Sequence, residues 1–268
     1  MGEVLRYSKF LETYKTRSYR LNHLEDYKRF FPVMSSPLLA GVVADLICDG
    51  HLQGSPIWRM DFTSRSVSEL DNFNERIKRL FNISGKIRKC TSNKFGESFN
   101  LGINCSPIAR ILFLCGVPAG QKVLTKFSLP RWIKEDKECF RAFCQRMFTC
   151  EGSIMHEKKR RMPQIRLEMW KSEELLKDGV FFMEEVCSGL KKYFDISTTI
   201  TLPKSKCVRK DEIVTTKIKI YILGESVIKF YNKIGFCNDK QQSLKALLTS
   251  NFRGSLEPEL HGDLVSIK

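Results

Sequence analysis

A chain of 268 residues with 42% apolar residues is long enough to bury one large or two ordinary hydrophobic cores, which excludes a disordered chain. The 45 Lys and Arg residues outnumber the 30 Asp and Glu residues, and the net charge of +15 favours an anionic partner, either a nucleic acid or a membrane surface. No apolar run approaches the ~20 residues of a membrane span and no signal peptide is recognisable, so we expect an intracellular protein without a membrane partner.

The ten cysteines are scattered through apolar runs without a CxxC pair. This pattern is typical of small buried side chains in a reducing compartment, such as an archaeal cytoplasm or an organelle matrix, and not of a disulfide framework. Structural zinc is not expected either, because the candidate ligands Cys48 with His51, and Cys150 with His156, each lack a second pair nearby.

Residues 1–35 are basic and rich in aromatic side chains. They form either an arm on a DNA backbone or a helix that packs on the next segment, and the sequence favours neither. A helix is then expected from Ser36, with Ser36 as its N-cap and Pro37 in its first turn. The apolar run Leu39–Gly50 continues it, and we expect Gly50 to end the helix in a left-handed turn, with Asp49 at the tip.

A second run with the same ending spans Phe143–Gly152, and Asp136 can cap its helix. Its acid, Glu151, lies 102 positions after Asp49. The segments after each acid recur in the same order, which indicates a duplicated unit with one acid per copy. The matching segments are Trp58–Thr63 and Ile165–Trp170, the helices from Ser66 and Ser172, Leu80–Ser84 and Tyr193–Ser197, Phe99–Asn104 and Thr216–Tyr221, and Gly116–Lys122 and Gly235–Lys240.

Apolar and polar residues alternate in the expected strands, over Trp58–Thr63, Gln164–Met169 and Lys217–Ile222. Period-two alternation predicts antiparallel sheets with one face on a core and one in solvent. The solvent faces are rich in Arg, Lys, Gln, Asn, His and Thr, with basic runs at the expected hairpin tips His156–Arg161 and Lys204–Lys210. Such side chains contact phosphates and base edges, and DNA contact is therefore favoured over an ordinary solvated surface.

The two acids are unusual where they stand. A helix carries partial negative charge at its C-terminal end, which disfavours a carboxylate there by ~0.3–1 kcal/mol unless a cation is near. A divalent metal would bind both the carboxylate and the free carbonyls of the last turn. Two acids at equivalent positions of a repeat therefore indicate a shared metal site.

The segments Leu39–Gly50 and Phe143–Gly152 resemble the paired motifs of the LAGLIDADG homing endonucleases, in the single-chain form of archaeal and organellar introns. Cys115–Lys122 and Leu129–Ile133 are also similar to that family, and the resemblance covers about residues 36–250. Two residues depart from it, because Asp45 and Arg146 stand where the family has apolar or small residues in the helix pair.

The resemblance implies an α+β fold of two pseudosymmetric αββαββα halves, whose antiparallel sheets form a saddle over a DNA duplex. The motif helices would lie side by side at the centre. The corresponding divisions are a basic N-terminal extension (1–35), a first half (36–126), a linker (127–135), a second half (136–250) and a flexible tail (251–268).

The implied activity is cleavage of double-stranded DNA, once per strand, with staggered 3′ overhangs. Asp49 and Glu151 would hold Mg²⁺ with the backbone carbonyls of Cys48 and Cys150, Mn²⁺ would replace it, and Ca²⁺ would occupy the site without supporting cleavage. Basic side chains around the metal would order water and balance charge on the phosphate. The matching positions are Lys122, Lys240, Arg65 and Lys171, while Trp170 and Ser64 stand where the family often has Gln.

The same resemblance assigns DNA contacts to the polar sheet faces and hairpin tips. In the first half these residues are His51, Gln53, Arg59, Asp61, Lys86, Arg88, Asn100 and Asn104. In the second half they are His156, Lys158, Arg160, Arg161, Gln164, Arg166, Glu168, Thr199, Thr201, Lys204, Lys206, Lys217, Lys219 and Tyr221.

Two alternatives stay open: a maturase that binds its host intron RNA on the same fold, and a DNA-binding regulator that has lost catalysis. Both acids are retained, which argues against the regulator. We expect a monomer. We also expect a free-standing protein and not an intein, because the chain begins Met1-Gly2 and ends Ser266-Ile267-Lys268, without the Cys or Ser start and the His-Asn end that protein splicing requires.

Overall fold

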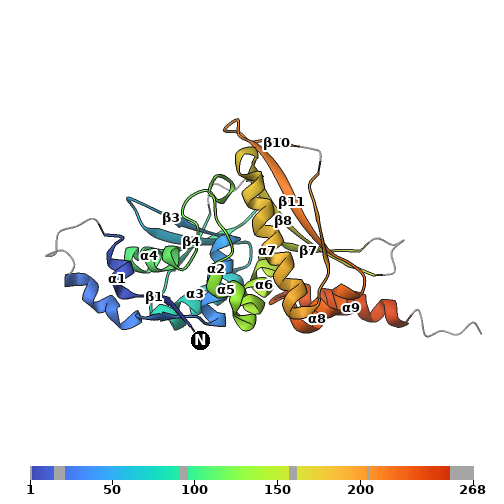
Figure 1. Cartoon of the computed structure of the whole chain (residues 1–268), viewed down its shortest axis with the longest axis horizontal. Coiled ribbons are helices and arrows are strands. Elements are labelled where there is room, and N and C mark those ends of the chain that lie inside the picture. The colour runs from blue at the N-terminus through green and yellow to red at the C-terminus, as the bar shows by residue number, and fades with distance from the viewer. Residues whose placement is uncertain (1, 15–21, 91–95, 157–161, 204–205, 254–268) are drawn as a thin grey trace, which may run out of the picture.

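Two similar halves stand side by side, each with one central helix and one antiparallel sheet (Figure 1). The computed structural model describes residues 2–14, 22–90, 96–156, 162–203 and 206–253. The first half has a four-stranded sheet in the order β3-β4-β6-β5. Its elements are α2 (Pro37–Ile47), β3 (Gly50–Gln53), β4 (Arg59–Ser64), α3 (Val67–Phe81), β5 (Lys86–Lys89), β6 (Phe99–Ile103) and α4 (Ser106–Leu114).

The second half repeats this order with longer strands. Strand β8 lies between β7 and β11, and β11 also pairs with β9 and with the short strand β10. The expected α+β fold with an αββαββα arrangement is therefore confirmed. The elements are α6 (Lys137–Glu151), β7 (Gly152–Met155), β8 (Gln164–Ser172), η4 (Glu173–Leu175), α7 (Leu176–Phe194), β9 (Thr198–Thr201), β10 (Cys207–Val208), β11 (Val214–Ile222), α8 (Glu225–Lys233) and α9 (Asp239–Arg253).

The segment that joins the halves contains η3 (Lys122–Leu124) and the short helix α5 (Arg131–Glu135). The described part of the N-terminal extension packs on the first half, which is the second of the two alternatives that the sequence left open. Phe10 and Leu24 are fully buried in the common core, and the guanidinium of Arg110 on α4 donates to the carbonyl of Thr13 at 2.6 Å. The extension comprises β1 (Glu3–Leu5), α1 (Tyr7–Leu11), η2 (Asn22–Phe30) and β2 (Val33–Met34).

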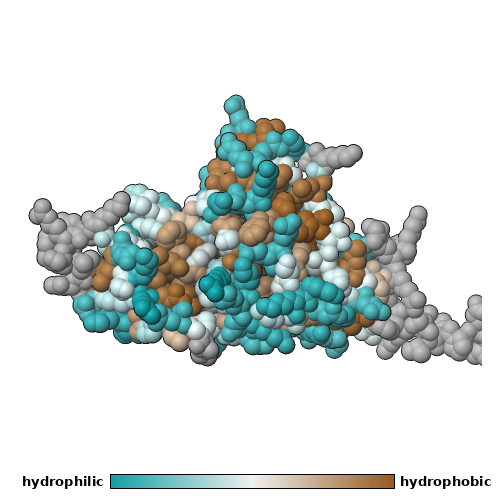
Figure 2. Space-filling model, in the orientation of Figure 1, coloured by the Kyte–Doolittle hydropathy of each residue, from teal (hydrophilic) through white to brown (hydrophobic). Residues whose placement is uncertain are grey.

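The alternation predicted for the strands is confirmed in both halves. Met60 and Phe62 on β4 are buried while Arg59, the first residue of that strand, is exposed. On β11 the side chains of Ile218 and Ile220 are fully buried. On the face shown in Figure 2, hydrophilic residues cover the helices along the lower edge, and hydrophobic residues gather around α7 and β11. Among the residues that the structure describes, no helix is both long and apolar enough to cross a lipid bilayer.

Helices α2 and α6 pack against each other more extensively than any other pair of helices that the structure describes (Figure 1). Both predicted N-caps are present: the Ser36 hydroxyl accepts from the amide of Leu39 at 3.2 Å, and the Asp136 carboxylate accepts from the amides of Glu138 and Cys139 at 3.0 and 2.9 Å. These caps fix where each helix begins and therefore where its other end meets the sheet.

The prediction that Gly50 and Gly152 end the helices in a left-handed turn is wrong. Gly152 has φ −80° and ψ 149°, and both glycines are the first residues of strands β3 and β7. Glycine is needed for a different reason, the close approach of the preceding helix. A Cβ on Gly152 would lie 2.3 Å from the Phe148 carbonyl oxygen, and one on Gly50 would lie 2.8 Å from the Leu46 Cα. The chain can therefore pass from helix into strand within one or two residues of each acid.

The two residues that depart from the family pattern bind each other across the helix pair. Arg146 Nε on α6 lies 2.6 Å from Asp45 Oδ1 on α2, and Arg76 on α3 holds the other carboxylate oxygen at 2.7 Å. The carboxylate of Asp45 is fully buried, and Arg146 also pairs with Glu69 at 3.2 Å. A buried charge is tolerated only when it is paired and hydrogen-bonded, as it is here.

Asp45→Ala is expected to lower the free energy of unfolding by about 3–5 kcal/mol, because it leaves two arginines without their shared buried partner. Arg141→Ala is the matched control, since Arg141 lies on the same helix as Arg146 but forms only an exposed pair with Glu138; we expect a change within ~0.5 kcal/mol there. Chemical denaturation measures both. Equal small effects in the two variants would contradict a structural role for the buried pair.

Candidate metal and nucleic-acid site

Asp49 and Glu151 lie at equivalent places, between the central helix and the first strand of each half. Asp49 follows α2 by two residues, and Glu151 is the last residue of α6. Both residues are exposed to solvent, but the surrounding protein displaces part of the water around their carboxyl groups. This desolvation raises the pKa of both carboxyl groups, and the charge of Asp49 raises the pKa of Glu151 further. The two acids thus lie close enough for the charge of Asp49 to act on Glu151 across the junction of the halves.

Two lysines take matching places beneath the acids. The Lys122 amine donates to the carbonyl of Cys48 and, at 2.8 Å, to that of Gly50. The Lys240 amine donates to the carbonyls of Thr149 at 2.6 Å and Gly152 at 2.7 Å. Each lysine therefore clamps the backbone on both sides of the acid in its own half.

The lysine charges also act on the acids. Burial lowers the pKa of both amines, and the neighbouring carboxylates partly oppose this. In turn, the ammonium groups of Lys122 and Lys240 lower the pKa of Asp49 and Glu151 against the larger effect of desolvation. The two acids and the two lysines thus influence one another's pKa values at the junction of the halves.

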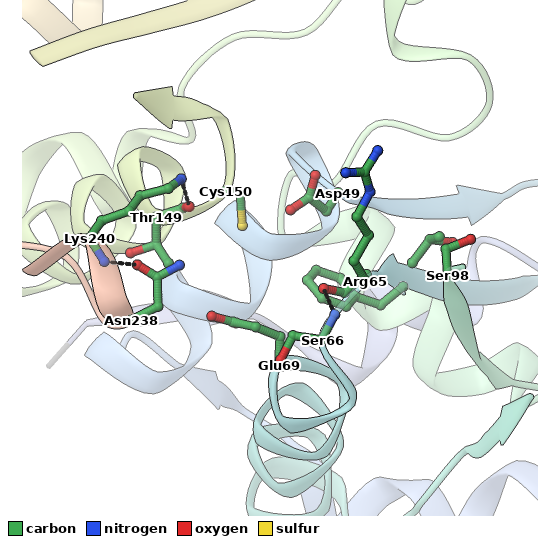
Figure 3. A pocket seen from close by; sticks show the side chains of 12 residues that line it. Asp49, Arg65, Ser66, Glu69, Ser98, Thr149, Cys150, Asn238 and Lys240 are labelled. Carbon is green, nitrogen blue, oxygen red and sulfur yellow. Dashed lines mark hydrogen bonds between the residues drawn. The ribbon is translucent and has the colours of Figure 1, made fainter. Parts of the chain in front are cut away.

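A cavity of about 710 Å³ opens beside Asp49 and spans both halves (Figure 3). On one side, the guanidinium of Arg65 lies beside Asp49 (Figure 3). On the other side are residues of the second half. The lining residues that were not chosen as site residues from the sequence include Ser66, Glu69, Ser98, Thr149 and Asn238. Three of these had a sequence signal, because Thr149 and Asn238 belong to repeated segments and Ser66 begins a repeated helix, whereas Glu69 and Ser98 had none.

The predicted equivalence of Lys171 with Arg65 is wrong. Alternate residues of β8, among them Ile165 and Leu167, point into the core. Lys171 belongs to the same alternating set and is 1% exposed. A shift of one residue places a side chain on the opposite face of a strand. The residue on the polar face is Trp170, which is 40% exposed and carries the Lys217 amine 4.8 Å from its ring.

The residues at the helix ends are suited to a hard divalent cation that takes few protein ligands, and not to a metal that is enclosed by protein side chains. Among the described residues, no group of three or more His, Cys, Asp or Glu side chains is placed to hold a metal. Magnesium does not require one, because it commonly binds one or two protein carboxylates together with water and substrate phosphate. The Cys48 carbonyl already accepts from Lys122, so only its second lone pair remains for a cation.

The polar face of the first sheet brings the predicted DNA-contact residues together. Across the four strands His51, Asp61, Gly102 and Lys86 stand in register, so they share one face. Gly102 adds no side chain, and a hollow of about 400 Å³ lies there. It is lined by the charged and amide side chains Arg59, Asp61, Lys86, Arg88, Asn100 and Asn104, while Gln53 pairs with Arg59 at the sheet edge.

The polar face of the second sheet is more strongly paired. Glu168 stands among basic residues, 3.0 Å from Arg166, 3.0 Å from Lys217 and 3.9 Å from Lys219. Thr201 stands opposite Lys219, and Thr199 opposite Tyr221, so these residues share the face.

Some predicted contacts lie elsewhere. Gln164 has the parity of Arg166 along β8 and so lies on the polar face, but it is buried there, opposite Met155 of β7. Lys206 forms an ion pair with Glu173 at 2.6 Å, and His156 is exposed after β7. Lys158, Arg160, Arg161 and Lys204, and the tail from residue 254, lie outside the described residues.

No protein-family model matches the chain. The chain is 30% identical over 222 residues to the tRNA-splicing ligase RtcB of Methanopyrus kandleri, an alignment that covers 78% of this chain and 22% of that protein. It is 25% identical over 212 residues to the replication factor C small subunit of Methanocaldococcus jannaschii, which covers 76% of this chain and 11% of that protein. The chain thus spans less than a quarter of the length of either relative.

Two solved structures share the fold at low identity. Full-length DUF199/WhiA from Thermatoga maritima has a TM-score of 0.51 at 14% identity, over 86% of this chain and 64% of that chain. The homing endonuclease I-WcaI, bound to its DNA recognition sequence, has a TM-score of 0.51 at 10% identity, over 84% of this chain and 92% of that chain. These similarities establish the fold that the sequence resemblance implied.

Lys122→Met is expected to raise the pKa of Glu151 and Asp49 above their already elevated values, because it removes a cation that lowers both. Carbon-13 NMR of the labelled side-chain carboxyl groups measures the two titrations. Lys78→Met serves as control, since Lys78 is exposed on the outer helix α3. An unchanged pKa of both acids in Lys122→Met would show that the charge of this lysine does not act on them.

Proposed function

We propose that this protein is a site-specific endonuclease that cuts both strands of a DNA duplex with a divalent metal ion and leaves staggered 3′ overhangs. One observation carries the proposal: two carboxylates, one from each half, converge at equivalent helix ends, each framed by a lysine that binds the adjacent carbonyls. A pseudo-twofold pair of acids matches the twofold relation of the two strands of a duplex.

The sequence relatives support the interpretation that this chain is a domain that has been inserted into unrelated proteins. They do not support the activities for which those proteins are named. Both alignments cover more than three quarters of this chain, so they overlap, yet the two relatives are named for unrelated activities. A shared stretch that fills 22% of one and 11% of the other is better explained as a common inserted domain than as the ligase or replication part. The structural neighbour that is bound to its DNA recognition sequence supports DNA as the ligand of this fold.

The chemistry follows from the residue types at the junction. Asp49 and Glu151 would hold Mg²⁺ with carbonyls of the helix ends, and the ion would polarise the phosphate and lower the pKa of an attacking water. Lys122 and Lys240 keep the acid-bearing turns fixed and supply positive charge. Arg65 lies where its guanidinium can stabilise negative charge on the phosphate beside Asp49.

The sheets would bind the duplex on their polar faces. The first sheet offers a hollow edged by Arg59, Lys86 and Arg88, and the second offers Arg166, Lys217 and Lys219. Because each phosphate contact releases counterions, affinity should fall steeply with salt.

A catalytically inactive DNA-binding protein is the second candidate. The polar face at the end of β8 carries Trp170 and no basic residue corresponding to Arg65, since Lys171 is buried. The two acids therefore have different surroundings. Such a difference would also be expected in a protein that has lost catalysis at one of its two acids.

Asp49→Asn and Glu151→Gln are each expected to lower Mg²⁺-dependent cleavage by at least about 1,000-fold, because each removes a metal-holding charge. The substrate is found by selecting a randomised duplex library for cleavage by the wild-type protein. DNA affinity, measured in parallel by fluorescence anisotropy, should change little. A variant that still cuts both strands at the normal rate would show that the acids are not the metal site.

Lys219→Ala and Lys86→Ala are expected to weaken binding of the selected duplex. Each should also reduce the slope of log affinity against log salt by about one, because each removes one cation from a DNA phosphate. Anisotropy titrations at several salt concentrations measure both quantities. Lys229→Ala is the control, because Lys229 lies on α8 and pairs with Asp195 away from the sheet face. Unchanged affinity and slope for both sheet variants would exclude these faces as the DNA-binding surface.

A further inference from the structure

The buried amine of Lys171 bridges the two halves of the protein. It extends from the core face of β8 in the second half and donates to the carbonyls of Lys122 and Thr125, each at 2.7 Å. Both acceptors belong to the turn around η3, which follows the first half in the segment that joins the two halves. A lysine that contributes nothing to the polar face therefore holds the segment that carries Lys122.

The surrounding structure is shaped to admit this side chain. Gly179 on α7 packs against it, and a Cβ there would lie 2.5 Å from the Lys171 Cγ. The amine lies 4.0 Å from the ring of Phe127, a cation–π contact that compensates part of its lost hydration. Burial lowers the pKa of Lys171 to about 8, partly opposed by Asp178, so the amine is kept there at a cost in solvation.

The two lysines beneath the acids differ in how the backbone holds them. Lys240 is the second residue of α9, a 15-residue helix, and its amide donates to the Asn238 side chain at 3.2 Å. Lys122 lies in a 3₁₀ segment of three residues, whose N-cap Gln121 makes no capping bond. Such a short segment leaves its carbonyls without helical partners, and Lys171 supplies donors to two carbonyls of this turn.

We propose that Lys171 is a positioning residue that acts through Lys122: by fixing the η3 turn from the opposite half, it holds the Lys122 amine against the carbonyls on either side of Asp49. This inference rests on the proposed nuclease function for its effect on cleavage. Its physical content, the placement of Lys122, stands independently of that function. The contacts run from the Lys171 amine to the Lys122 carbonyl, and from the Lys122 amine to the Cys48 and Gly50 carbonyls.

The first test is a double-mutant cycle on cleavage of the selected duplex. Lys171→Met is expected to lower the single-turnover rate about 10- to 100-fold at saturating DNA with little change in affinity, since small displacements of catalytic groups have effects of that size. In the Lys122→Met background the same substitution should have no further effect. An equal loss in both backgrounds would overturn the proposal, because it would indicate a general structural defect.

Two variants guard against misfolding and unrelated effects. Lys171→Gln keeps an amide donor for a carbonyl and should retain more activity than Lys171→Met; the reverse order would contradict the proposal. Lys233→Met removes another lysine that donates to a backbone carbonyl, that of Phe194 at the end of α7. It should leave the cleavage rate unchanged, and a loss equal to that of Lys171→Met would show that any such lysine matters equally.

The second test needs no cleavage and separates this inference from the proposed function. The pKa of the Lys122 amine is measured by NMR of labelled lysine without DNA, with Lys122→Met to assign the signal. Burial lowers that pKa in the folded protein, so release of the turn in Lys171→Met should raise it toward the ordinary value of 10.5. If no DNA is ever cut but this rise occurs, the positioning role stands and the nuclease proposal fails. If cleavage occurs and Lys122 titrates as before in Lys171→Met, the positioning role fails.

Discussion

The packing of α2 against α6 is the constraint on which the rest of the structure depends. Because the two helices run side by side, their C-terminal ends bring one acid from each half to the same place, and the strands that follow diverge into two sheets. The helices are in direct contact at Gly41 of α2, where a Cβ would stand at the ordinary contact distance of 3.4 Å from the Cγ of Arg146 on α6. The buried pair between Asp45 and Arg146 then fixes how the helices face each other.

This arrangement concentrates charge at the junction of the two halves. Desolvation raises the pKa of the acids, and the lysines reduce the repulsion between the carboxylates without neutralising them directly, because their hydrogen bonds go to backbone carbonyls. A divalent cation would relieve the remaining repulsion. Under the proposed function, the ligands of that cation would come from both halves.

Much of the fold followed from the sequence because the signals were local or repeated. The N-caps Ser36 and Asp136, the period-two strands and the equivalence of Asp49 with Glu151 each depend on residues within one element or on the duplication. The lysines at the ends of the matching segments were found in the same way, by their places in the repeat. The remaining features depend on tertiary contacts that a repeat cannot reveal. The family resemblance matches Lys171 to the basic residue near the metal at the end of the second strand, but the register of β8 places Lys171 in the core.

The central claim is that both acids bind the metal together at the phosphates of a bound duplex. The most direct measurement is a crystal structure of the protein with its selected DNA and Mn²⁺, located by anomalous scattering. The account predicts anomalous peaks within ligand distance of the Asp49 and Glu151 carboxylates, with a phosphate of each strand adjacent. Manganese elsewhere, or DNA bound on the helical face and not on the sheets, would contradict it.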